Sequence, residues 1–201
     1  MLVTEKNLLL TFPPNDFDTS VAVSTWTNYG YNVLNYTIAD LRGITDKYLT
    51  ELRKYKARPL FYESAWGNIP SKDRDDLFIK ILKEPLASWL HVGKRNDETD
   101  EKNLLFIYST HDQDIEEAIE TWKERGYIVN LYPMVDLREV QDSIIIEAVK
   151  DSIIREARKF KSIRPFFFES TWSIIPHEDL CELHDRLLIE PEVYWTQFSK
   201  K

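Results

Sequence analysis

The sequence predicts an α/β fold made of two tandem copies of a βαβαβα unit, each with a mainly parallel sheet, in a pseudo-twofold arrangement. Two observations carry this prediction. An ordered series of residues recurs between the first and second halves of the chain. Within each half, short apolar segments alternate with amphipathic segments of helical periodicity, an order that is typical of parallel sheets covered by helices.

The repeat keeps a spacing of 96 residues through the first part of each copy and 106 residues through the last part. The second copy therefore holds ten more residues in between, and we expect them to lengthen its second helix by about 15 Å. The matched segments include Asn7–Leu10 with Asn103–Phe106, Thr25–Trp26 with Thr121–Trp122, Gly30–Tyr31 with Gly126–Tyr127, Asp40–Arg42 with Asp136–Arg138, Arg58–Pro59 with Arg164–Pro165, Glu63–Trp66 with Glu169–Trp172 and Glu84–Pro85 with Glu190–Pro191.

A polar segment separates the two copies. Residues 93–102 contain almost no apolar side chains and many charged ones, as solvated linkers do. We therefore expect a first α/β repeat over residues 1–92, a charged linker over 93–102, and a second repeat with a longer second helix over 103–201.

Each expected element follows from a local pattern. Apolar runs predict the first strands, glycine ends the first helices, β-branched and aromatic segments predict the second strands, and proline precedes the third. A proline interrupts the last helix, and we expect Trp89 and Trp195 to fold a last turn onto the sheet. The expected strands are 8–12, 31–36, 60–62, 104–108, 127–132 and 166–168; the expected second helices are 45–57 and 140–162, and the last helix of the first copy is 72–83.

Composition narrows the class of protein. Hydrophobic residues make up 43% of the chain and charged residues 30%, a balance that favours a folded globular protein. No apolar run reaches the ~18 residues of a membrane span, so no membrane partner is expected. The single cysteine and the absence of a leader pattern predict an intracellular protein of the cytoplasm or nucleus. The net charge of −8 disfavours nucleic-acid binding except through a local basic patch.

Polar residues follow each predicted strand at the edge where parallel α/β sheets bind ligands. Carboxylates there could hold Mg²⁺, and arginine could neutralise a phosphate, which would suggest phosphoester chemistry. Helix capping and structural ion pairs explain the same residues, and no phosphate-binding or nucleophile motif accompanies them. The catalytic candidates are Asp40, Arg42, Glu63, Asp136, Arg138 and Glu169, and Asp16 and Asp112 are weak metal candidates.

Two further sets of residues are candidates for binding. The segments Glu63–Trp66 and Glu169–Trp172 place Ser64, Trp66, Ser170 and Trp172 in the turn after the third strand, where binding residues are common. Basic residues, including Arg58 and Arg164, cluster at the end of each second helix, where they complement the helix dipole or form an anion site.

The second copy also has His177, Cys181 and His184 at helical spacing, which resembles a zinc site. His177 and His184 would lie ~10 Å apart along a straight helix, so one ion cannot bind all three. We therefore expect no metal and no other cofactor, with Mg²⁺ only under the enzymatic alternative.

These observations favour a non-catalytic protein-interaction module with a protein partner. The first alternative is a metal-dependent phosphoesterase or nucleotide-processing enzyme that uses the carboxylates at the strand ends. The second alternative is a nucleic-acid binder that uses the basic helix ends.

Overall fold

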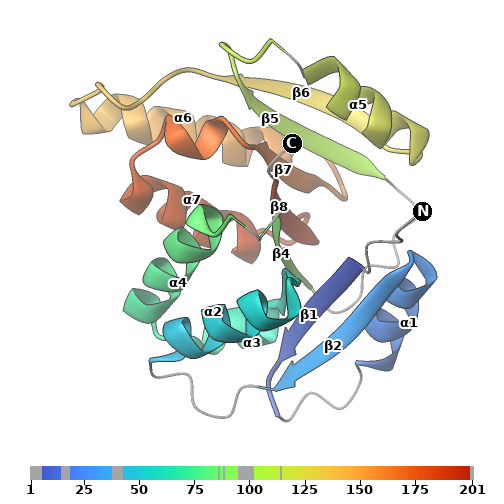
Figure 1. Cartoon of the computed structure of the whole chain (residues 1–201). Helices are drawn as coiled ribbons and strands as arrows, with labels where there is room; N and C mark the ends of the chain where they lie inside the picture. The colour runs from blue at the N-terminus through green and yellow to red at the C-terminus, as the bar shows by residue number, and fades with distance from the viewer. Residues whose placement is uncertain are drawn as a thin grey trace. The chain divides into compact units, whose positions relative to one another are not determined.

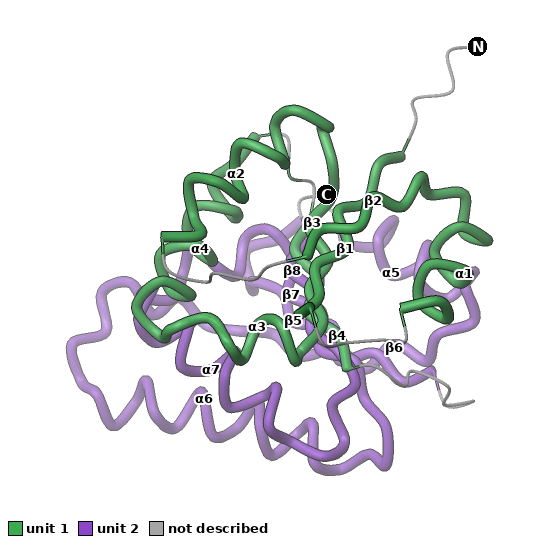
Figure 2. The backbone as a smooth tube through the Cα atoms, turned by 90° about the horizontal axis from the view of Figure 1, so that it is seen from below, with its two compact units in different colours: residues 1–95 green, residues 96–201 purple. Residues whose placement is uncertain are grey.

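The computed structural model describes residues 6–14, 19–37, 43–85, 87, 89–94, 102–113 and 115–199. The chain divides into two compact units, unit 1 over residues 1–95 and unit 2 over residues 96–201 (Figure 2). Each unit is an α/β structure with a parallel sheet, as the sequence predicts for the fold class. No helix among the described residues is long and apolar enough to cross a membrane.

Unit 1 contains four parallel strands in the order β2-β1-β3-β4 (Figure 1). Its elements, in chain order, are β1 (Lys6–Phe12), α1 (Ser20–Asn28), β2 (Tyr31–Thr37), α2 (Ile44–Tyr55), β3 (Arg58–Tyr62), α3 (Glu63–Asn68), α4 (Ser71–Lys83) and β4 (Trp89–Gly93).

Unit 2 contains four parallel strands in the equivalent order β6-β5-β7-β8. Its elements are β5 (Asn103–Ser109), α5 (Ile115–Glu124), β6 (Ile128–Met134), α6 (Ser143–Ala157), β7 (Arg164–Phe168), the 3₁₀ helix η1 (Thr171–Ser173), α7 (His177–Ile189) and β8 (Trp195–Ser199). The strand registers also agree, because Leu8 pairs with Arg58 and Leu104 pairs with Arg164.

The helices of unit 1 lie on both faces of its sheet (Figure 1). Alternate residues of the first strand face opposite sides, so Leu8 and Leu10 pack in the cluster that α1 covers. On the other face, Tyr48 of α2 packs against Phe61, and Phe61 packs against Trp66. Residues buried on both faces explain why the apolar strand segments lack alternation.

Each unit ends in a fourth strand, which corrects the expected three-strand unit. Trp89 and Trp195 begin β4 and β8 and do not form a last helical turn. The segments resemble neither a continuous apolar run nor an alternating one, because His91, Thr196 and Gln197 occur among the apolar residues. All three are nevertheless buried in the parallel sheet.

The prediction of a long second helix over residues 140–162 of unit 2 is also wrong. Helix α6 has 15 residues against 12 in α2, so most of the ten added residues lie in the connections on either side. Asp142 sets the start of α6 by accepting a hydrogen bond from the Ile144 N–H at 2.9 Å.

The glycines expected after the first helices, Gly30 and Gly126, both have φ of +84°, a backbone conformation that favours glycine.

Candidate functional site

The sheet of unit 2 has a topological switch point between β5 and β7. From β5 the chain crosses to β6 on one side, and from β7 it crosses to β8 on the other. The connections that leave the carboxyl ends of β5 and β7 therefore diverge, and in α/β proteins ligands bind at such places. Asp112 follows β5 and Ser170 follows β7, so both lie at this edge.

Asp112 joins the two connections. Its Oδ2 accepts a hydrogen bond from the Ser109 N–H at 2.9 Å and another from the Ser170 hydroxyl. Ser109 is buried, and its hydroxyl accepts the His111 N–H at 3.2 Å. The Asp112 carboxylate therefore braces the turn after β5 against the turn after β7, as an aspartate in a hydrogen-bonded turn does.

Asp136 and Arg138 form a local ion pair after β6. The Arg138 guanidinium donates to both carboxylate oxygens at 3.0 Å, and the Arg138 N–H donates at 3.0 Å as well. These hydrogen bonds, the side-chain ones first, lower the pKa of Asp136 to about 2, and the positive charge of His111 adds to the effect. The same partner raises the pKa of Arg138.

The chemistry available at this edge follows from these partners. A Mg²⁺ ion at Asp112 or Asp136 would compete with N–H, hydroxyl or guanidinium donors that already bind the carboxylate oxygens. The side chain of His111 is exposed, and its charge acts on Asp136. The edge is therefore a set of braced turns that present an imidazole and a guanidinium to solvent.

Several candidates of unit 1 lie outside the described residues: Asp16, Asp40 and Arg42. Glu63 and Ser64 open α3, where a negative side chain is favoured by the helix dipole. In unit 2, Glu169 and Ser170 directly precede η1. The structure thus brings Ser170 to Asp112, and it places Glu63 and Glu169 at strand ends as the sequence predicts.

The two candidate tryptophans differ in burial. Trp66 is 1% exposed and packs edge-on against Phe61 and Phe78, so it is a core residue of unit 1. Trp172 is half-buried and lies 6.1 Å, centroid to centroid, from Phe198. A binding role for the exposed part of an aromatic ring is therefore open to Trp172 and not to Trp66.

The candidate arginines are held by aromatic side chains. The Arg58 guanidinium donates to the Tyr31 hydroxyl at 2.7 Å, and the Arg164 guanidinium donates to the Tyr127 hydroxyl at 2.6 Å. Both guanidinium groups also lie over aromatic rings, with Arg164 at 5.5 Å from the Trp195 ring centre. These contacts hold the two arginine side chains at the start of β3 and of β7.

Other basic residues at the helix ends form ion pairs with nearby acids. Arg53 at the end of α2 pairs with buried Glu84 at 2.8 Å, and Arg158 after α6 pairs with buried Glu190 at 2.6 Å. Lys159, in the turn after α6, pairs with Glu156 near the end of that helix. Neutralised in this way, the basic clusters lose much of the charge that phosphate binding would use.

The three residues that resemble a zinc site do not converge. His177 is exposed at the start of α7, whereas Cys181 and His184 are buried. The His184 Nε2 lies 2.7 Å from the Thr196 hydroxyl on β8. His184 therefore joins α7 to the sheet, and the spacing along the straight helix separates it from His177 as expected.

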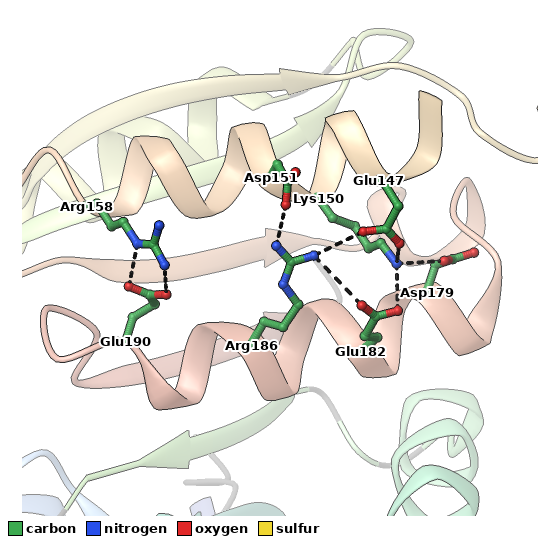
Figure 3. Close-up of polar contacts among 8 residues, drawn as sticks. All are labelled: Glu147, Lys150, Asp151, Arg158, Asp179, Glu182, Arg186 and Glu190. Carbon is green, nitrogen blue, oxygen red and sulfur yellow. Dashed lines mark hydrogen bonds and ion pairs between the residues drawn. The ribbon is translucent and has the colours of Figure 1, made fainter. Parts of the chain in front are cut away.

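Sequence reasoning missed a charged cluster between α6 and α7 (Figure 3). Lys150 has a fully buried side chain, and its ammonium contacts Asp179 at 3.0 Å, Glu182 at 2.7 Å and also Glu147. Burial alone lowers the pKa of Lys150, but the hydrogen bonds to these carboxylates outweigh burial and raise it overall. The signal was present in the sequence, because Lys150 shares the helical phase of Ile146, Ile153 and Ile154.

The carboxylates of Glu147, Asp179 and Glu182 lie close enough together to hold a metal ion. The Lys150 ammonium occupies the place between them and supplies the positive charge that these carboxylates need. The cluster is therefore an ion-pair network that joins two helices.

Comparison of the chain with protein-family models, with curated proteins and with solved structures gives no match.

Proposed function

We propose that the chain is a non-catalytic protein-interaction module formed by its two α/β units, with a protein partner. The observation that carries the proposal is a run of exposed apolar side chains in unit 2. Ile128, Leu131, Val135, Ile144 and Ile145 are between 47% and 76% exposed, and all lie from β6 to the first turn of α6. Ile144 and Ile145 are neighbours at the start of α6 and form the candidate contact, because exposed apolar side chains that lie together are typical of protein-binding surfaces.

The polar groups of unit 2 support the same function. The carboxylates at the strand ends that the structure describes hold turns together, and the arginines at the helix ends are paired. Carboxylates and arginines that are already paired fit a structural role better than acid–base or metal chemistry. The enzymatic and nucleic-acid alternatives have less support among the described residues.

The agreement between the units supports the inference of a tandem duplication. Strand order and strand register agree in both units, and pairs such as Arg58–Tyr31 and Arg164–Tyr127 recur. Folding contacts are required in each copy of a duplicated unit, so their retention fits a scaffold role. The pseudo-twofold relation of the copies stays a prediction.

The proposal is tested with the full chain as bait in extracts of its source cells, followed by mass spectrometry of what it retains. The double substitution Ile144→Glu and Ile145→Glu should abolish recovery of a specific partner, because two charges would have to be buried in the interface. Ile189→Glu is the matched control, because Ile189 is 77% exposed and lies at the end of α7. Equal recovery by all three proteins, or no specific partner for any, would count against the proposal.

A further inference from the structure

Helix α6 of unit 2 is apolar on two faces, of which one is buried within the unit. On the opposite face, Ile144 is 76% exposed and Ile145 is 47% exposed. The same face continues, at helical spacing, through exposed Ala148 and half-buried Ser152. We call these four residues the outer face of α6. A helix that meets solvent on one face usually has charged side chains there, so an uncharged outer face indicates a further contact.

The charged side chains in the middle of α6 point away from the outer face. Glu147, Lys150 and Asp151 extend toward α7, where each contacts a charged side chain of that helix (Figure 3). These charges are therefore already used within unit 2. Between Ile144 and Ser152 the described side chains of the outer face are all uncharged.

The two ends of the outer face carry opposite charges. Glu139 and Asp142 lie just before α6, and exposed Arg155 lies in its last turn. The remaining charged residues near the end of α6, at positions 156, 158 and 159, form ion pairs within unit 2. The outer face is therefore acidic at its start, uncharged in its middle and basic at its end.

We propose that the outer face of α6 binds the outer face of a second copy of this chain, with the two helices antiparallel. In this arrangement Ala148 lies at the twofold axis, and Ile144 of each copy faces Ser152 of the other. Arg155 of each copy then lies beside the acidic start of the other helix, which makes the face complementary to itself. This inference rests on the proposed function and names the partner of the contact that Ile144 and Ile145 form.

The distribution of charge is what specifies a second copy. Each chain has a net charge of −8, so two copies repel each other wherever acidic surfaces meet. The uncharged middle of the outer face removes this repulsion, and the reversal of charge from one end to the other matches the same face turned by a twofold axis. The small side chain of Ala148 also lets the two helix axes approach to about 8–10 Å.

The first test measures the mass of the full chain by sedimentation equilibrium at increasing protein concentration. We expect a reversible equilibrium between monomer and dimer. Ala148→Glu should weaken the dimer by about tenfold or more, because two negative charges would meet at the twofold axis. Thr25→Glu is the matched control, since it adds the same charge at an exposed position of α1 and should change the dissociation constant by less than about twofold. A chain that stays monomeric, or a dimer that Ala148→Glu leaves intact, would overturn the inference.

Cysteine cross-linking tests the antiparallel arrangement. Under mild oxidation Ala148→Cys should form a disulfide between two copies, because side chains at the twofold axis lie within reach of each other. Ser152→Cys should not, because the two copies of a position four residues from the axis lie about 12 Å apart along the helices. The natural Cys181 is buried and remains as it is in both variants. Equal cross-linking of the two variants, or none with Ala148→Cys, would contradict the arrangement.

The inference and the proposed function can fail separately. If the chain is monomeric but retains another protein, and the double substitution Ile144→Glu and Ile145→Glu releases that protein, the proposed function stands and the second copy is not the partner. If the dimer forms as expected and no other protein is retained from cells, the contact between copies remains while a function in binding other proteins loses support.

Discussion

The α2–α4 pair of unit 1 and the α6–α7 pair of unit 2 have equivalent places in their units but are joined differently. Each pair has an arginine–glutamate contact at its end, formed by Arg53 in unit 1 and Arg158 in unit 2. In unit 2 further cations cross the middle of the seam between the two helices, where Lys150 and Arg186 contact carboxylates of the opposite helix (Figure 3).

The buried positions of the two helices identify the exchange that makes this difference. Tyr48 and Leu52 are buried in α2 with the same spacing as Ile153 and Ala157 in α6. In that register buried Thr45 corresponds to buried Lys150. A small hydroxyl side chain in unit 1 is therefore replaced in unit 2 by a long cation.

Similar backbones therefore tolerate different side chains at the contact between these two helices. A buried ammonium needs carboxylates around it, because an unpaired buried charge lowers the stability of the fold by roughly several kcal/mol. Once Asp179 and Glu182 provide them, those carboxylates depend on the lysine in return. In unit 1 Thr45 stands at this place, and Lys80 pairs with Asp76 on its own helix.

The largest expected effect comes from removing the buried cation. Lys150→Thr, which copies the residue of unit 1, should destabilise the protein by about 1–2 kcal/mol, because three partly exposed carboxylates lose their shared counter-charge. Urea unfolding measures the change. Lys159→Thr is the control and should cost less than about 0.5 kcal/mol, since Lys159 lies in the turn after α6 and its pair with Glu156 joins no second helix. Equal stability of both variants would refute the dependence.

A reciprocal exchange tests whether an arginine joins the two helices where a lysine pairs on its own helix. Arg186→Lys should destabilise unit 2 by about 0.5–1 kcal/mol, because a lysine loses the fork that contacts both Asp151 and Glu147. Lys80→Arg should slow hydrogen exchange in α4, because a guanidinium can bridge toward Asp46. Amide hydrogen exchange measured by NMR reports the effect of Arg186→Lys on α6 and α7 and the effect of Lys80→Arg on α4. Unchanged hydrogen exchange in α4 would show that the longer arginine side chain is not sufficient to join α4 to α2.

The sequence predicted the α/β class and the strand-forming segments because apolar runs, helix-ending glycines and prolines are local signals. It missed β4 and β8, where buried His91 and Gln197 break the apolar pattern and only pairing with β3 and β7 makes them strands. It also assigned added residues to α6, since helical periodicity does not show where Asp142 caps the helix.

The candidate site was predictable in place but not in its contacts. The rule for parallel sheets placed Asp112, Asp136 and Ser170 at the strand ends, where the structure has them. Which of them meet depends on the strand order, which places β7 beside β5 and brings Ser170 to Asp112. Sequence spacing carries no information about that order.

The smallest expected effect concerns an ion pair that joins no helices. Arg138→Gln removes the side-chain donors of Asp136, so the pKa of Asp136 should rise from about 2 toward the ordinary value of 3.8. Because the folded pKa lies below the ordinary one, any stabilisation by the pair is present above about pH 4 and is lost as the pH falls through 2, and solvent exposure of Arg138 keeps it small. Carboxyl NMR measures the pKa, and urea unfolding at pH 7 should change little, since Arg138 and Asp136 lie in one exposed connection. A loss of stability as large as that of Lys150→Thr would mean that local pairs and pairs between helices contribute alike, contrary to the comparison of the two seams.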